Sequence, residues 1–305
     1  MAMAKARTLN QPSRASNTIL NIIAAVFSIA CVFPFLFVII ISFTNEKALS
    51  RDGYRIIPKE WSLEAYRYIF KTGDQLLRSF GITVLITVVG ALLSLILISH
   101  FAYAISRSSF RYRNFFSFIA IFTMLFNGGM VPSYIINTRM LHLKDTLWAL
   151  ILPLAVNAFY IMIMRTFYRT TVPDAIVEAG KIDGAGELRV FYSVVLPISL
   201  PGLATIGLFS TLGYWNDWFN ALLYIDNPNL VPLQALLMRI ENSMQFLVTN
   251  SALSGSGQGM ALLSTLPQDS ARMAMVVLAT VPIVLAYPFF QRFFISGLTV
   301  GAVKG

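Results

Sequence analysis

The stretch that decides the fold is TVPDAIVEAGKIDGAGELRVFYSVVLPISLP, residues 171–201. It is polar and contains several glycines, and long apolar segments lie on both sides of it. Pro173 suits the first turn of a short helix, because that position does not need a backbone N–H. Glu178 then lies toward the positive N-terminal end of the same helix. Gly184 predicts a turn after that helix, since glycine readily adopts the left-handed conformation, and a second short helix should follow through Phe191.

The spacing of this stretch resembles the coupling loop of bacterial ABC-importer permeases. That pattern reads Glu-Ala-Ala, three residues, Gly, nine residues, Ile, one residue, Leu-Pro. Here the positions are occupied by Glu178-Ala179-Gly180, Gly184, Val194 and Leu196-Pro197. Gly180 departs from the usual alanine, at a cost to the helix of up to about 1 kcal/mol, and Val194 departs from isoleucine. The alternative interpretation is an ordinary amphipathic loop with two helices.

Composition places the chain in a membrane. Of 305 residues, 56% are hydrophobic and 12% are charged, whereas a soluble domain carries about 25% charged residues. The net charge of +9 would suggest nucleic acid binding in a soluble protein. In a membrane protein it instead reflects topology and contact with anionic lipid. We therefore expect an all-α polytopic membrane protein that does not bind nucleic acid.

Six apolar segments are long enough to span a bilayer, which takes about 20 residues. They cover approximately residues 19–43, 79–105, 115–136, 146–167, 195–224 and 273–295. The first is too long for the core of a signal peptide. The expected organisation is an N-terminal arm (1–17), a six-helix permease domain (18–296) with the coupling loop at 171–197 between the fourth and fifth spans, and a C-terminal tail (297–305).

Six spans place both termini on one side, which is cytoplasmic if the Glu178 loop is cytoplasmic. The compact basic cluster of Arg107, Arg111 and Arg113 behind the second span is of the kind that stays in the cytoplasm. Even with this cluster counted, lysine and arginine are almost equally divided between the two sides on this arrangement. The orientation therefore rests on the coupling loop.

Two spans contain unusual sequence. The third is interrupted by Asn127-Gly128-Gly129, and such a break survives in a membrane only where protein or a water-filled cavity satisfies the backbone. A transport pathway and a packing kink both explain it. The fifth contains a charged residue, which in a span is by default a functional hypothesis. Its candidate substrate-pathway residues are Tyr214, Trp215, Asn216, Asp217, Trp218 and Asn220.

Helical spacing would place Tyr214 with Trp218, and Asn216 with Asn220, on shared faces of the fifth span. Aromatic faces beside amide and carboxylate groups suit a sugar, whose C–H face stacks while its hydroxyls need hydrogen-bond partners. The alternative is an aromatic belt at the membrane interface, with Asp217 reaching toward the outer leaflet.

No catalytic or metal site is expected. Cys31 is the only cysteine, and His100 and His142 are too isolated for a metal site. The glycine-rich segment at 254–259 lacks the lysine of a phosphate-binding loop and predicts a flexible linker. The chain should not be an enzyme and should hold no cofactor of its own.

Most of the chain from about residue 20 resembles the maltose-type carbohydrate importer permeases, in the branch that serves complex oligosaccharides, including uronate-rich ones. The motifs are ALILP (149–153), WNDWFNAL (215–222) and GLTVGAVKG (297–305). The resemblance implies a bacterial plasma-membrane protein with both termini cytoplasmic. It also implies a homologous second permease, a cytoplasmic ATPase dimer that binds ATP and Mg, an extracytoplasmic binding lipoprotein and an oligosaccharide substrate.

The resemblance also assigns residues that meet the ATPase. In the coupling loop these are Glu178, Ala179, Gly180, Asp183, Gly184, Leu196 and Pro197, and in the tail Gly297, Leu298, Thr299, Gly301 and Lys304.

Three alternative functions remain. An ABC permease for peptides or phosphate esters would share the loop. A secondary transporter would need more carboxylates within spans than Asp217. A membrane-embedded enzyme would need a catalytic set.

Overall fold

The computed structural model describes residues 14–71, 73–254 and 268–302. These residues form helices joined by turns, and the single β-type pairing among them is an isolated bridge between Thr44 and Trp61. The all-α prediction is therefore confirmed for the part of the chain that the structure describes. The first residues of the predicted N-terminal arm, most of the glycine-rich segment and Lys304 lie outside it.

The chain divides into two compact units. The first comprises Met1–Ile69 and Ser251–Leu278 and contains α1 (Arg14–Ser42), α2 (Glu46–Asp52), most of α3 (Glu64–Phe70) and the start of α16 (Gln268–Ala302). Within it, the Glu46 carboxylate accepts the backbone N–H groups of Asp269 and Ser270, both at 3.0 Å. These N–H groups have no partner inside their own helix, so α2 fixes the start of α16.

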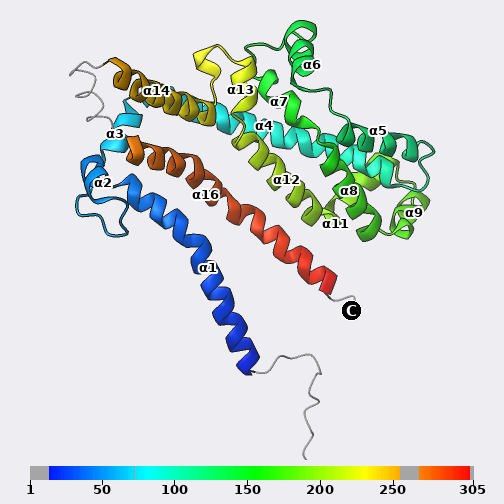
Figure 1. The fold of residues 1–305 in the computed structure, drawn as a ribbon. Coiled ribbons are helices and arrows are strands. Elements are labelled where there is room, and N and C mark those ends of the chain that lie inside the picture. Colours follow the sequence, from blue (N-terminus) through cyan, green and yellow to red (C-terminus); the bar gives the residue numbers. More distant parts are fainter. Residues whose placement is uncertain (1–13, 72, 255–267, 303–305) are drawn as a thin grey trace, which may run out of the picture. The chain divides into compact units, whose positions relative to one another are not determined.

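The second unit comprises Phe70–Asn250 and Ala279–Gly305, and the long helix α4 (Gly73–Ser106) runs through it. Helix α4 packs against α12 (Leu200–Trp215), α8 (Ala158–Thr171) and α7 (Trp148–Ala155). The unit also contains α5 (Arg113–Leu125), α6 (Met130–Ile135), the π-helical turn Ile136–Met140, α9 (Asp174–Ile182), α10 (Glu187–Val190), the π-helical turn Phe191–Val195, α11 (Leu196–Ile198), α13 (Phe219–Tyr224), the 3-10 turn Pro228–Leu230 and most of α14 (Leu233–Ser254). Figure 1 shows α5, α8, α9 and α11 gathered around one end of α4.

Three helices are long and apolar enough to cross a membrane by themselves: Ser16–Ser42, Gly73–Ser106 and Gln268–Gln291. Three bent pairs of helices pass the same test together: Arg113–Leu125 with Met130–Met140, Trp148–Ala155 with Ala158–Thr171, and Glu187–Ile198 with Leu200–Trp215. Each of the six predicted spans overlaps one of these. The described chain thus contains three clear spanning helices, and up to six spans if each bent pair crosses once.

The bends were only partly predicted. The pair around Gly129 turns by 112°, because Gly129 adopts a φ of 89° between α5 and α6. The pair around Asn157 turns by 47°, and there the Asn157 side chain accepts the N–H groups of Phe159 and Tyr160 as the cap of α8. The prediction of one continuous helix for the fifth span, residues 195–224, is wrong. The chain bends by 83° at Ser199, and Pro201 in the next turn lacks the N–H that would continue the ladder.

Candidate functional site

The predicted coupling segment forms two short helices joined by a tight turn. Pro173 is the N-cap of α9 and has an extended ψ of 139°, so the prediction that it lies inside the first turn is wrong by one position. Gly184 adopts a φ of 81°, and its N–H donates to the Lys181 carbonyl at 3.0 Å. The predicted turn at Gly184 is confirmed, and α10 and the π-helical turn behind it lead the chain back toward α12.

Helix α9 has one buried face and one exposed face. Val177 is buried in a core cluster together with Val190 and Phe191, whereas Glu178 and Ala179 are exposed. This packing fixes α9 and α10 against the ends of α4 and α8 while leaving the acidic side chain accessible. The geometry therefore presents Glu178 outward on a supported short helix.

Some apolar side chains of α9 and α10 are also exposed, and the motif alone did not identify them. Ile176, Ile182 and Leu188 are all exposed, Ile182 to 85%. The sequence did contain a signal for these exposed side chains, because they interrupt the polar faces of two short amphipathic helices. Ile182 follows Glu178 by four residues and lies on the same side of α9, so an acidic and an apolar side chain are exposed together there.

The structure gives a reason for Gly180. A Cβ atom at this position would lie 3.1 Å from the Cγ2 atom of Val190, which is tighter than ordinary van der Waals contact. Glycine therefore allows α9 to lie closer to α10 than alanine would. Of the other predicted coupling residues, Asp183 is exposed at the C-cap of α9, Leu196 is partly buried against the core cluster, and Pro197 is exposed at the start of the next helix.

The second candidate site lies at the break between α12 and α13. Helix α12 ends at Trp215 and α13 begins at Phe219. The shared helical faces predicted for Tyr214 with Trp218 and for Asn216 with Asn220 are therefore wrong, because the intervening residues are not helical. The break divides the predicted pathway residues into a packed pair and an accessible group.

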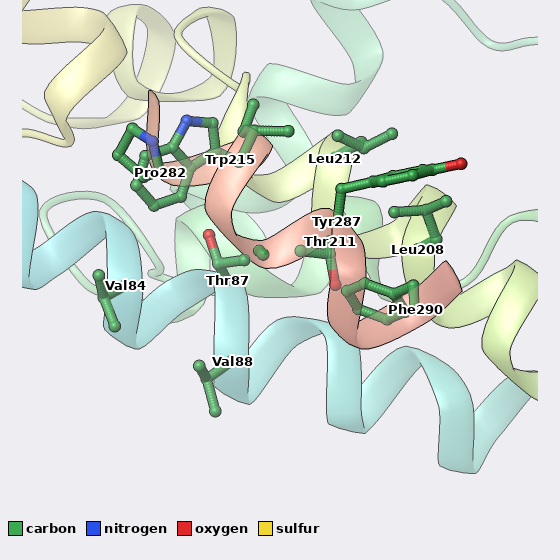
Figure 2. A pocket seen from close by; sticks show the side chains of 12 residues that line it. Val84, Thr87, Val88, Leu208, Thr211, Leu212, Trp215, Pro282, Tyr287 and Phe290 are labelled. Atoms are coloured by element: carbon green, nitrogen blue, oxygen red, sulfur yellow. The ribbon is translucent and has the colours of Figure 1, made fainter. Parts of the chain in front are cut away.

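Tyr214 and Trp215 are the packed pair. Tyr214 is buried, and its hydroxyl donates to the Ile151 carbonyl at 2.8 Å. The Trp215 indole N–H donates to the Ala279 carbonyl at 2.9 Å. Trp215 also lines an apolar cavity of about 180 Å³ between α4, α12 and α16, whose walls include Val84, Val88, Leu212, Pro282 and Phe290 (Figure 2). Neither side chain has a polar group free for a sugar.

The remaining residues form the accessible group. Asn216 is exposed, and Trp218 is exposed to 39%. Both carboxylate oxygens of Asp217 accept hydrogen bonds from Asn220, from its backbone N–H at 3.2 Å and from its side-chain amide at 2.9 Å. Asp217, which precedes the N-cap Trp218, thus accepts an N–H group from the first turn of α13, and this charge has a structural partner that the sequence did not reveal.

The predicted ATPase-contacting tail lies at the end of α16. The backbone of residues 297–302 continues that helix, so Gly297, Leu298, Thr299 and Gly301 are helical in the structure. Among the described residues, no group of histidine, cysteine or acidic side chains is placed to hold a metal ion.

Comparison with known proteins gives consistent matches over most of the chain. Residues 96–300 match the family described as the binding-protein-dependent transport system inner membrane component. The polygalacturonan/rhamnogalacturonan transport system permease protein YtcP of Bacillus subtilis is 40% identical over 92% of this chain and 94% of its own. The arabinooligosaccharides transport system permease protein AraQ of Halalkalibacterium halodurans is 30% identical over 94% of this chain and 96% of its own.

A solved structure also matches. It is a chain of a bacterial ABC transporter involved in the import of the acidic polysaccharide alginate. The TM-score is 0.74 with 28% sequence identity, and the match covers 93% of this chain and 99% of that one. The family match over residues 96–300 includes both candidate sites.

Proposed function

The chain belongs to the family of binding-protein-dependent transport system inner membrane components and is the permease subunit of an ABC importer, and we propose that its cargo is an acidic oligosaccharide. The main support for the permease assignment is the family match over residues 96–300, which includes the Glu178 loop and the break between α12 and α13. One relative is named for polygalacturonan and rhamnogalacturonan, and the solved neighbour for acidic alginate. These names support an acidic sugar cargo.

The proposed assembly follows from the coupling segment. The exposed carboxylate of Glu178, with apolar neighbours such as Ile182, suits the cleft of a cytoplasmic ATPase subunit. We further propose a homologous second permease, two copies of the ATPase and an extracytoplasmic binding protein. In this arrangement each bent pair supplies one crossing of the bacterial plasma membrane, the third of them through α12 while the coupling segment 171–197 stays in the cytoplasm, giving six spans with both termini in the cytoplasm. ATP hydrolysis would be the work of the separate ATPase.

Reconstitution tests this assignment. The purified chain alone should hydrolyse no ATP, because hydrolysis belongs to the ATPase subunit, and proteoliposomes that hold the complete transporter should take up labelled oligogalacturonate when binding protein is present. ATP hydrolysis and uptake should both rise with binding protein and substrate. Neutral maltodextrin is the control cargo. Hydrolysis by the isolated chain, with contaminating ATPases excluded, would contradict the permease assignment, and equal uptake of neutral sugar or of peptide would contradict the acidic cargo.

The break between α12 and α13 is the proposed sugar contact. Its accessible residues are Asn216 and Trp218, held by the bonds between Asp217 and Asn220. An exposed indole ring offers a face for a sugar ring, and the amide groups offer hydrogen-bond partners. The packed residues Tyr214 and Trp215 support this break from behind rather than contact the cargo.

Replacing Trp218 and Trp215 separately should distinguish the two roles. We expect Trp218→Ala to raise the KM of uptake about tenfold, because stacking of one ring contributes about 1–3 kcal/mol by analogy with base stacking, while the amount of assembled transporter is unchanged. Trp215→Ala should instead lower the amount of assembled transporter, because it enlarges the apolar cavity and removes the indole hydrogen bond to the Ala279 carbonyl. The KM of uptake and the amount of assembled transporter, measured for each variant, distinguish a sugar contact from a packing role. Normal uptake kinetics in Trp218→Ala would remove this residue from the pathway.

A further inference from the structure

A buried arginine lies where the coupling segment meets the transmembrane helices. Helix α4 ends at Ser106, and the side chain of the next residue, Arg107, is only 7% exposed. Burying a charge is costly unless it is paired and hydrogen-bonded. The arginine cluster that follows the second span is therefore not uniform, because Arg111 in the same cluster is exposed.

The guanidinium group of Arg107 joins three helices. Its Nη1 atom lies 3.2 Å from a carboxylate oxygen of Asp174, the first residue of α9. Its Nη2 atom donates to the carbonyl of Tyr168, near the end of α8, at 3.1 Å. Its Nε atom donates to the Ser106 hydroxyl at the end of α4, at 3.0 Å. The group also lies over the Tyr103 ring, 5.4 Å from its centroid.

Asp174 is held at both of its oxygens. One accepts from Arg107, and the other accepts from the Ser108 hydroxyl at 3.3 Å. The Asp174 side chain is 57% exposed, so water would satisfy it without these partners. The arginine has no such alternative. Breaking the pair would therefore cost little free energy at Asp174, which water can reach, and much more at the buried guanidinium group of Arg107.

The covalent connection between α8 and α9 is short but does not fix their angle. Only Val172 and Pro173 separate the two helices, and three backbone dihedrals there can change, the φ and ψ of Val172 and the ψ of Pro173, since proline fixes only its own φ. Val172 and Val177 are buried in the core cluster at this corner, and Arg107 and the Ser108 hydroxyl make the polar contacts that tie Asp174 to it. A second polar contact, from the Tyr103 hydroxyl to Glu187 on α10, is longer at 3.4 Å.

We propose that Arg107 is a positioning residue that holds α9 to the ends of α4 and α8, so that displacement of α9 by the ATPase moves both transmembrane helices together. The inference rests on the proposed function of the coupling segment. Without the guanidinium group, α9 would turn about Val172 and Pro173, and ATP hydrolysis would proceed with little movement of α4. The loss would appear in the ratio of ATP hydrolysed to sugar transported, which a simple loss of folded protein does not change.

The test uses the complete transporter in proteoliposomes, with uptake and ATP hydrolysis measured on the same preparation. Arg107→Met keeps an unbranched apolar stem and removes the charged guanidinium group. We expect it to raise the ATP hydrolysed per sugar about tenfold, and Asp174→Asn to raise it about threefold, because the amide retains part of the hydrogen bonding. The double variant should be no worse than Arg107→Met, since the two residues act through one contact. Arg111→Met, an exposed arginine of the same loop, is the control and should match the wild type.

The outcomes separate this inference from the proposed function. An unchanged ratio in Arg107→Met overturns the positioning role, and additive effects in the double variant do the same. If Arg107→Met is not recovered in the membrane, the test uses Asp174→Asn, because this half-exposed residue tolerates substitution. An unchanged ratio of ATP hydrolysed to sugar transported in Asp174→Asn then overturns the proposal. Glu178→Lys is measured in parallel. Blocked transport in Glu178→Lys with unchanged ratios in the Arg107 series refutes the positioning role alone, whereas normal transport in Glu178→Lys refutes the coupling segment on which it rests.

Discussion

Uptake should fall to background when Glu178 is replaced by lysine, while the amount of membrane-inserted chain and its pairing with the second permease stay near wild type. Glu178 is exposed on α9, and an exposed ion pair contributes about 0–1 kcal/mol to folding. In a docked interface, however, lysine would face the basic group expected in the ATPase cleft. Like charges brought together there cost several kcal/mol. Membrane insertion is measured by immunoblot, ATPase association by co-purification, and uptake with labelled sugar.

Gly184→Val should also block uptake, but by a different route. A β-branched residue resists the φ of 81° that Gly184 adopts, at about 1–2 kcal/mol. The turn would then open and α9 would be misaligned rather than repelled. Gly186→Val is the matched control, because Gly186 has an ordinary φ of −68° and no atoms within 4 Å of an added Cβ. It should retain most of the uptake.

A charge reversal in the ATPase cleft distinguishes the two mechanisms. An acidic residue placed there should restore uptake to Glu178→Lys, because it re-forms an opposite-charge pair. It should not restore Gly184→Val, whose defect is geometric. Wild-type uptake by Glu178→Lys with its native ATPase would show that this segment is not the coupling element.

Features set by local chemistry were predictable from the sequence. The six apolar segments stand out because a span in lipid must be apolar over about 20 residues. The turn at Gly184 follows from the conformational freedom of one residue. Asn157 offered a comparable signal, since asparagine is a favoured N-cap, but the apolar residues around it hid the break between α7 and α8. These features depend on a few neighbouring residues.

Features set by contacts between distant residues were not predictable. The sequence grouped Tyr214 with Trp218 as pathway residues, and it contained no sign that the Tyr214 hydroxyl donates to Ile151. Similarly, Arg107 and Arg111 are alike in sequence, and only the arrival of Asp174 and Tyr168 at the end of α4 makes one of them a buried connector. The pairing of helices selects which polar side chains pack and which remain accessible.

Gly90→Ala should greatly lower the amount of folded transporter, although it adds only a methyl group. A Cβ atom at this position would lie within 2.6 Å of three ring carbons of Tyr214. The ring has no room to withdraw, because it is buried and its hydroxyl is bonded to Ile151. Helices α4 and α12 would have to separate along the contact that holds the second unit together. Overpacking of this kind costs about 1–3 kcal/mol and occasionally more.

Gly81→Ala is the matched control in the same helix. An added Cβ at Gly81 meets nothing within 4 Å, and alanine is favoured over glycine in a helix interior by about 1 kcal/mol. This variant should therefore match or exceed the wild type in its thermal midpoint, measured on transporter purified in detergent. Tyr214→Leu removes the ring that the new methyl group would strike, so Gly90→Ala should cost less in the Tyr214→Leu background than alone. Equal midpoints for Gly90→Ala and Gly81→Ala would show that α4 and α12 do not approach each other through this glycine. The ring of Tyr214 would then not be packed between α4 and α12. Tyr214 would again be a candidate for contact with the sugar.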